Sequence, residues 1–325
     1  MPDEIEFRTK PEIAIAQIKH ALSNRIRVSA WTFDELYGRD GRFLDGLESL
    51  GQVFVGEVPS NFYGWVKKPI VVQKHPKKRG KGRPKSTPYV AIHCPSSKIS
   101  NLLKHSPVFR QQAWQRYRLK DTGKGPCVWE IKWAPFWRKD EQGLPTRRHC
   151  LIVARHVLTG EVKYFVSNRV PGEKNPITDK TITLRGLLRV AFGRWSIESC
   201  FPESKEELGM DHYEVRGWRC VHRHFYVTQL SQLFCARVRQ EYDEATKDGV
   251  DRISVEQVRS AMNIWLDTVD LPPSSRKARC ENEIKKQEYY QRRNKQARDS
   301  HTKTTIEKLK DEGIDPDKIK SCILT

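Results

Sequence analysis

The segment from residue 27 to residue 58 constrains the fold most strongly, because its apolar pattern changes period twice. Residues 27–33 have the β-branched and aromatic content of a strand, residues 40–50 carry apolar side chains at helical spacing, and residues 52–58 again resemble a strand. Gly51 ends the helical stretch and Pro59 ends the second strand. Two strands joined by a helix pair in parallel, since the helix returns the chain to the same end of the sheet. The segment therefore predicts an α/β sheet with parallel strands.

The rest of the chain divides into β-like and helical stretches. Thr9 and Glu12 form a capping-box pattern that predicts a helix at the start of the chain. Short β-like pieces separated by Gly, Pro and charged turns follow, and helical spacing dominates after residue 183. We therefore expect four segments: a partial core over residues 1–59, a mostly β insertion over 60–180, two further core helices over 181–245, and a basic helical extension over 246–325.

The charge of the chain indicates a polyanionic partner. Its 59 Lys and Arg residues exceed its 40 Asp and Glu residues and give a net charge of +19. Nucleic acid is the commonest partner of such a chain, although a ribosome-associated protein or a merely soluble basic protein has the same composition. The most basic stretch, residues 74–85, reads KHPKKRGKGRPK and predicts an exposed loop, either a solvated linker or a contact with DNA. The residues that we expect to contact DNA there are Lys77, Lys78, Arg79, Lys81 and Arg83.

Several other classes of protein are excluded. The longest apolar runs are only a few residues, so no membrane-spanning helix is expected. The polar start, MPDEIEFRTK, does not resemble a signal peptide. The eight cysteines are scattered without a C-x-x-C pair, which argues against a zinc ribbon and favours free thiols in a cytoplasmic compartment.

Asp34 is the first candidate site residue, because it directly follows a predicted strand. Open α/β sheets place their ligand crevice at the carboxyl ends of the strands. A carboxylate at that place can hold a hard divalent cation. From position alone, a turn or a helix N-cap is the more common role of such an aspartate.

Glu198 is the second candidate, because it continues the apolar stripe that contains Ala191 and Trp195. A charge on an apolar helix face is costly unless it is paired or bound to a metal. Arg194 lies one turn earlier and Lys205 lies seven residues later, so all three are expected on about the same side. The spacing is equally compatible with an ordinary surface pair between Arg194 and Glu198.

Two further groups have weaker signals. Cys220, His222 and His224 suggest a metal site, but the two histidines point in different directions on a helix, so a DNA-facing or core-edge cluster is favoured. Four tryptophans of the β-like region either stack on bases or, as we expect, pack its core. They are Trp65, Trp129, Trp133 and Trp137.

The spacing of Arg194, Glu198 and Lys205, R-(3)-E-(6)-K, resembles the Y-(2)-R-(3)-E-(6)-K signature of bacterial insertion-sequence DDE transposases. The longer string RWSIESCFPESKEELGMDHYEVRGW resembles the catalytic helix of their DDE superfamily endonuclease branch. WTFDELYG, the F-x-T-K-P-E start and the carboxyl-terminal YYQRRNKQARDSH are also similar to segments of such proteins.

The resemblance implies an RNase H-like mixed sheet flanked by helices, with a mostly β insertion and a helical carboxyl-terminal region. It implies cleavage at transposon ends and strand transfer that depend on Mg²⁺ or Mn²⁺. Asp34 would be the second catalytic Asp and Glu198 the catalytic Glu, both as metal ligands, and Arg194 and Lys205 would contact phosphate. The implied partner is double-stranded DNA, bound by a homodimer in the bacterial nucleoid.

The sequence departs from the family pattern at two places. Ala191 occupies the position of the signature tyrosine, and Asp3 is the sole aspartate before Asp34. The first catalytic Asp of the family lies on a strand far upstream of the second, so the resemblance implies a chain that lacks the amino-terminal part. A catalytically inactive DNA-binding remnant is the alternative to an active transposase. A structural RNA-binding protein is a third possibility that no motif supports.

Overall fold

The apolar pattern of residues 27–58 produces the expected parallel pairing at one edge of a sheet. The Trp31 N–H donates to Val53 O at 2.8 Å, the Val55 N–H donates to Trp31 O at 2.9 Å, and the Glu57 N–H donates to Phe33 O at 3.0 Å. These bonds alternate between the two segments, as they do in a parallel pair. Of the first predicted strand, only Trp31 forms a β-bridge, with Phe54. We call residues 31–33 the edge segment. Parallel pairing is therefore confirmed, although one partner is shorter than expected.

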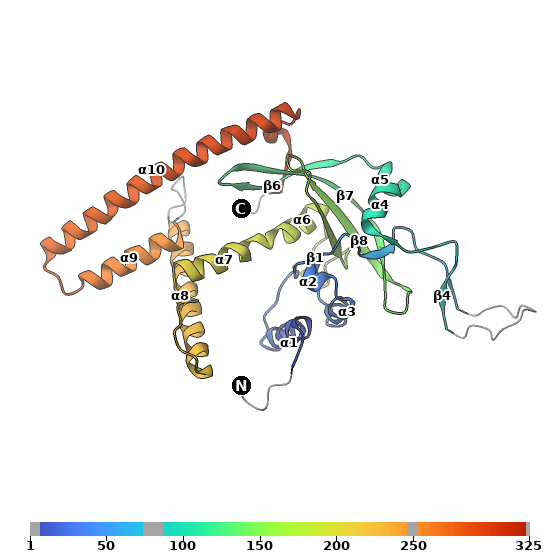
Figure 1. Ribbon diagram of the computed structural model, residues 1–325, viewed down its shortest axis with the longest axis horizontal. Coiled ribbons are helices and arrows are strands. Elements are labelled where there is room, and N and C mark those ends of the chain that lie inside the picture. The colour runs from blue at the N-terminus through green and yellow to red at the C-terminus, as the bar shows by residue number, and fades with distance from the viewer. Residues whose placement is uncertain (1–6, 74–86, 246–252, 323–325) are drawn as a thin grey trace, which may run out of the picture. The chain divides into compact units, whose positions relative to one another are not determined.

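The computed structural model describes residues 7–73, 87–245 and 253–322 (Figure 1). The chain divides into two compact units. We call residues 6–194 and 301–325 the sheet unit, and residues 1–5 and 195–300 the helical unit. The predicted basic loop, residues 74–85, lies outside the described residues. The assignment of a core, an insertion and an extension to parts of the chain stays a prediction.

The sheet unit contains one eight-stranded mixed sheet among its described residues. Its main path runs in the order β1-β9-β8-β7-β2-β5, and β6 pairs with both β7 and β10. The strands of this sheet are β1 (Val55–Glu57), β2 (Tyr63–Trp65), β5 (Ser97–Lys98), β6 (Gln115–Thr122), β7 (Gly125–Lys139), β8 (Pro145–His156), β9 (Val162–Ser167) and β10 (Lys320–Ser321). A separate two-stranded ribbon pairs β3 (Val71–Val72) with β4 (Tyr89–Val90).

The region between residues 60 and 180 is mostly β, as predicted. β8 and β9 form a hairpin across Thr159 and Gly160, in which they pair antiparallel with Cys150 opposite Ser167. Trp129 and Trp65 are buried in the sheet, which confirms core packing for these two rings. The sequence analysis missed β6, because its polar sequence QRYRLKDT buries only Tyr117 and Leu119 against β7.

Helices flank the sheet and enclose its core (Figure 1). The main cluster joins Leu44 and Leu47 to Phe54, Phe136 and Leu151, all fully buried. The helices of this unit are α1 (Lys10–Ser23), α2 (Glu35–Gly38), α3 (Gly41–Ser49), α4 (Ile99–His105), α5 (Pro107–Arg110) and α6 (Leu184–Gly193). The capping box of Thr9 and Glu12 is formed at the start of α1. The expected mixed α/β class is confirmed and is consistent with an RNase H-like fold.

The carboxyl-terminal residues complete the sheet unit. Leu309 and Ile314 pack against Val128 of β7 in a small cluster of their own. Beyond them, the 3₁₀ helix η1 (Pro316–Lys318) leads into β10, which pairs in parallel with β6. β10 therefore pairs with backbone N–H and C=O groups at the outer edge of β6 that would otherwise face solvent.

The helical unit consists of four helices among its described residues. They are α7 (Trp195–Glu206), α8 (Trp218–Ala245), α9 (Val255–Thr268) and α10 (Pro273–Asp311), whose last turns belong to the sheet unit. A capping box of Ser254 and Gln257 starts α9. Cys235 of α8 packs with Val255 and Val258 of α9 in a local core. None of the helices described is long and apolar enough to cross a membrane.

Candidate functional site

Asp34 lies at the carboxyl end of the edge segment, as the sequence predicts. Its Oδ1 accepts the N–H of Leu36 at 3.0 Å and the N–H of Tyr37 at 3.4 Å. It is therefore the N-cap of the short helix α2, which is the commoner of the two roles expected from its position. Both of these bonds use Oδ1, so the cap itself leaves the other carboxylate oxygen, Oδ2, for a ligand. The side chain is half-buried.

A glycine fixes the turn that carries Asp34 against the sheet. A Cβ atom at Gly38 would lie 1.9 Å from the backbone oxygen of Glu57. Only glycine allows this approach, because real Cβ atoms do not come so close to a backbone atom. The pattern D-E-L-Y-G therefore combines an N-cap at its first residue with a close contact at its last. Phe33 packs beside the same turn, and its ring lies over the Cα of Gly56 in β1.

Glu57 is a charged residue of this corner that the sequence analysis did not identify. It ends β1, beside Phe33, and its carboxylate contacts Lys163 Nζ at 3.3 Å and Arg194 Nη2 at 3.5 Å. All three side chains are less than one-fifth exposed. The signal that could have found it is the parallel register, because the carboxyl ends of parallel strands meet at one edge of a sheet. Arg194, the expected phosphate contact, is thus positioned by a carboxylate of the sheet unit.

Glu198 and Lys205 lie on one side of α7 in the helical unit. Both are exposed, and their separation of seven residues places them about 10 Å apart along the helix axis. The opposite side of α7 makes the contacts with α8 and α9: Gln232 with Cys200 Sγ at 3.1 Å, Arg239 with Glu203 at 3.9 Å, and Arg259 with Glu207 at 3.0 Å. Packing thus turns the predicted glutamate and lysine away from the core of this unit.

The described residues do not form a complete metal site. No three His, Cys, Asp or Glu side chains among them come together in a way that could hold a metal ion. Asp34 supplies one carboxylate in the sheet unit, and Glu57 is already engaged by two cations. Two-metal phosphoryl chemistry requires several carboxylates around one pair of ions. Binding of Mg²⁺ or Mn²⁺ by Asp34 and Glu198 therefore stays a prediction.

His222 and His224 of α8 each contact a neighbouring group of the helical unit. His224 Nε2 lies 2.9 Å from Gly209 O, which ties α8 to the loop after α7. The His222 ring lies 4.1 Å from that of Trp218, centroid to centroid. With Cys220, these residues belong to the described part of the chain, in which no metal-binding group was found.

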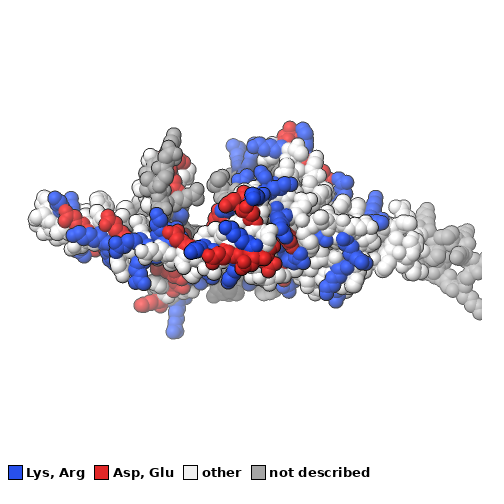
Figure 2. Space-filling view, turned by 90° about the horizontal axis from the view of Figure 1, so that it is seen from above, with Lys and Arg blue, Asp and Glu red and all other residues white. Residues whose placement is uncertain are grey.

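On the visible face of the described residues, basic side chains are distributed among acidic ones (Figure 2). Figure 2 shows Lys and Arg interleaved with Asp and Glu across the visible face. The five basic-loop residues expected to contact DNA lie outside the described residues, so their role stays a prediction. They are Lys77, Lys78, Arg79, Lys81 and Arg83.

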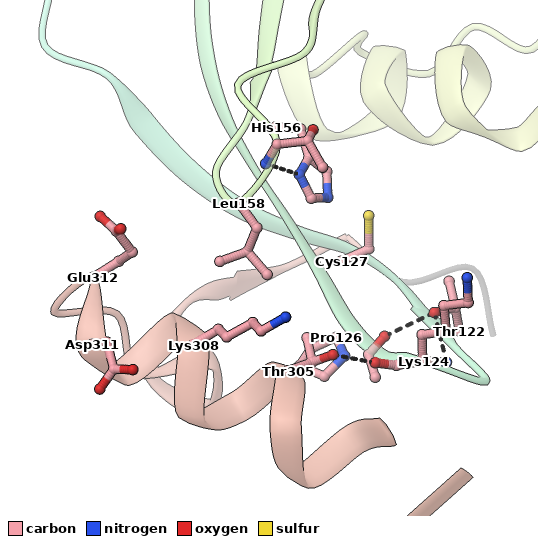
Figure 3. A pocket seen from close by; sticks show the side chains of 12 residues that line it. Thr122, Lys124, Pro126, Cys127, His156, Leu158, Thr305, Lys308, Asp311 and Glu312 are labelled. Atoms are coloured by element: carbon pink, nitrogen blue, oxygen red, sulfur yellow. Dashed lines mark hydrogen bonds between the residues drawn. The ribbon is translucent and has the colours of Figure 1, made fainter. Parts of the chain in front are cut away.

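A cavity of about 580 Å³ lies away from these residues, between the β6–β7 hairpin, the β8–β9 turn and the end of α10 (Figure 3). Its lining includes His156, whose Nδ1 accepts the Thr159 N–H at 3.1 Å, and Cys127. Burial lowers the pKa of His156 and raises the pKa of the Cys127 thiol, so both favour their neutral forms. Lys308 and Thr305 of α10 close the other side. The cavity contains neither Asp34 nor Arg194, and we assign it no part in the candidate site.

Comparison with known proteins supports the description of the first 126 residues. A search of curated proteins found no match. A family model described as DDE superfamily endonuclease matches residues 1–126, a stretch that contains Asp34 and Glu57 but not Glu198. The amino-terminal 126 residues are thus similar to DDE superfamily endonucleases, and this similarity suggests a transposase-like nuclease function.

Proposed function

We propose that this protein is a DNA transposase of the DDE type, which cleaves the ends of an insertion sequence and joins them to target DNA. Asp34 and Glu198 would bind Mg²⁺ or Mn²⁺, and Arg194 and Lys205 would contact the DNA backbone. The observation that carries the proposal is the position of Asp34, directly after a parallel-paired segment and within the stretch similar to endonucleases. The choice of Glu198 rests on the resemblance of residues 194–218 to a catalytic helix.

The charge and the side-chain chemistry agree with a DNA substrate. A net charge of +19 favours binding to a polyanion, and the phosphate backbone is the part of DNA that such a charge contacts. When bound, divalent ions would activate the attacking oxygen and stabilise the leaving oxygen. The residues of this chain would hold the ions and orient the DNA. A homodimer that pairs two transposon ends is part of the same proposal.

The test is nicking of DNA that carries the ends of the element, in the presence of Mg²⁺ or Mn²⁺. We expect Asp34→Asn and Glu198→Gln to lose nicking while they keep DNA binding. Asn caps a helix about as well as Asp, so the first substitution removes a charge without removing the cap.

Two matched controls make this test specific. Asp40 caps α3 through the N–H of Phe43 just as Asp34 caps α2, so Asp40→Asn is expected to keep nicking. Glu206 is an exposed glutamate of α7, so Glu206→Gln is expected to do the same. Nicking that survives both Asp34→Asn and Glu198→Gln would contradict the site.

The second candidate function is DNA binding without cleavage. It is favoured by the net charge of +19, since phosphate contacts from basic side chains support DNA binding without a metal site. Under this alternative, DNA binding is sensitive to salt but no divalent ion produces nicks. The same assay therefore separates the two functions.

A further inference from the structure

The amino-terminal half of α8 carries three rings in one row. Trp218, His222 and Tyr226 are spaced by four residues, which places them on neighbouring turns of one helix face. The ring centroids of Trp218 and His222 lie 4.1 Å apart, and those of His222 and Tyr226 lie 6.4 Å apart. Trp218 is 50% exposed and Tyr226 is 68% exposed. Two exposed rings thus lie on either side of a half-buried third, and we call the three the ring row.

The ring row faces away from the core of the helical unit. Cys235, which packs against Val255 and Val258 of α9, is nine residues after Tyr226 and therefore about 180° around the helix from it. Thr228 is also buried, on nearly the same side as Cys235. The packing that holds α8 in place therefore leaves the ring row unused.

The charges on the part of the helix that carries the ring row have one sign. Residues 218–240 contain four arginines and no Asp or Glu, and Glu214 lies in the loop before the helix. Arg219 and Arg223 flank the row and are exposed, and neither forms a salt bridge with a described carboxylate. A face that combines flat rings with such arginines fits a partner with ring faces and negative charge.

We propose that this face of α8 binds unpaired nucleotides of DNA. Trp218, His222 and Tyr226 stack on exposed bases, and Arg219 and Arg223 contact the phosphates. Single strands offer both groups, whereas paired bases in a duplex have their faces covered by their neighbours. The proposal deepens the proposed function, on which it rests for the choice of DNA, because cleavage and joining of DNA strands expose unpaired nucleotides.

The charge argues against a second copy of this chain as the occupant. In a symmetric contact through this face, Arg219 and Arg223 of both copies would come together without carboxylates to neutralise them. A strand of phosphates removes this repulsion and replaces the counterions around the arginines.

The test is the affinity of the full chain for a single-stranded oligothymidylate of about 15 nucleotides, compared with a duplex of the same length. We expect Trp218→Ala and Tyr226→Ala each to weaken single-strand binding about tenfold, and to leave duplex binding within about twofold, because base stacking acts on unpaired bases. Trp218→Phe keeps a ring and is expected to recover most of the affinity.

Trp265 provides a matched control. It is a 59% exposed tryptophan of α9 in the same unit, so Trp265→Ala is expected to leave both affinities unchanged. Equal losses for Trp218→Ala and Trp265→Ala, or equal losses for single strand and duplex, would overturn the proposal. A dimer in solution that dissociates on Trp218→Ala would also overturn it and assign the face to a contact between copies.

Failure of this proposal differs from failure of the proposed function. If single-strand binding depends on the ring row but no nicking occurs with any divalent ion, the α8 site is supported and the nuclease function is contradicted. If nicking depends on Asp34 and Glu198 while Trp218→Ala binds single strands normally, the nuclease function is supported and the α8 site is contradicted.

Discussion

Gly38 lies directly against the backbone carbonyl of Glu57, so the turn that carries Asp34 rests on the last residue of β1. This contact joins a helix N-cap to the end of the neighbouring parallel strand. The position of Asp34 therefore depends on Gly38, a residue without a side chain. Substitutions at this corner can therefore separate the effects of backbone position from those of charge.

Gly38→Ala is expected to destabilise the protein by about 2 kcal/mol or more, because its Cβ would overlap Glu57 O and force the turn away from β1. Urea unfolding measures the change. Gly217→Ala is the control, because the nearest atom to its Cβ would be Cys220 Sγ at 3.7 Å, an ordinary contact. Equal stability of the two variants would contradict the close approach at Gly38.

Asp34→Ala should lower the free energy of unfolding by about 1 kcal/mol, which is the typical cost of losing an N-cap. Asp34→Asn should lower it much less, since its side-chain oxygen still accepts the Leu36 and Tyr37 N–H groups. Thermal melting of both variants tests this order. If Asn is as destabilising as Ala, the carboxylate stabilises the fold by its charge and not as a cap.

Glu57→Gln is expected to cost about 2 kcal/mol of stability, since it removes the buried carboxylate that contacts Lys163 and Arg194. Glu161 provides the comparison: it contacts the same Lys163 at 3.7 Å but is 55% exposed. Glu161→Gln should therefore change stability by less than about 0.5 kcal/mol. Denaturant midpoints of the two variants measure the difference, and equal midpoints would show that Glu57 does not act as the buried member of the cluster.

His156 should make folding sensitive to mild acid. Burial lowers its pKa below the ordinary value of 6.5, so the unfolded chain binds a proton more readily than the folded one. The contribution of His156 to stability is therefore full above pH 6.5 and falls as the pH drops through the lowered pKa of the folded state. His156→Asn removes this titration, and its unfolding free energy should fall less between about pH 7 and pH 5. Parallel pH profiles for the two proteins would contradict the expectation.

Replacing the five basic-loop residues by glutamine is expected to weaken DNA binding and its dependence on salt. If each residue contacts one phosphate, the slope of the logarithm of affinity against the logarithm of salt concentration falls by about 4 to 5 in magnitude. Titrations at several salt concentrations measure this slope. An unchanged slope would assign the loop to a solvated linker. The residues to replace are Lys77, Lys78, Arg79, Lys81 and Arg83.

Sequence patterns predicted the features that depend on residues close together in the chain. The capping box at Thr9 involves a partner three residues away, and it is formed. The parallel pairing around Trp31 follows from one strand–helix–strand unit. The N-cap role of Asp34 was also among the roles expected from its position.

Features that depend on distant partners were missed. The carboxylate of Glu57 meets an arginine 137 residues away, and no local pattern indicates such a contact. β6 was overlooked because its polar sequence gains its strand conformation from pairing with β7 and β10. A two-metal site also collects carboxylates from separate elements, so its prediction rests on resemblance and stays a prediction.

The pairing of β10 with β6 has a consequence for synthesis of the protein. β10 lies near the carboxyl end of the chain, so a ribosome translates the whole helical unit before it reaches the strand that completes the sheet unit. The sheet unit therefore cannot complete its sheet until residues 195–300 have been synthesised. Until residues 320–321 emerge, nascent chains present β6 with one edge unpaired. We expect this interval to be the one in which chains on a crowded polysome are most prone to mispair.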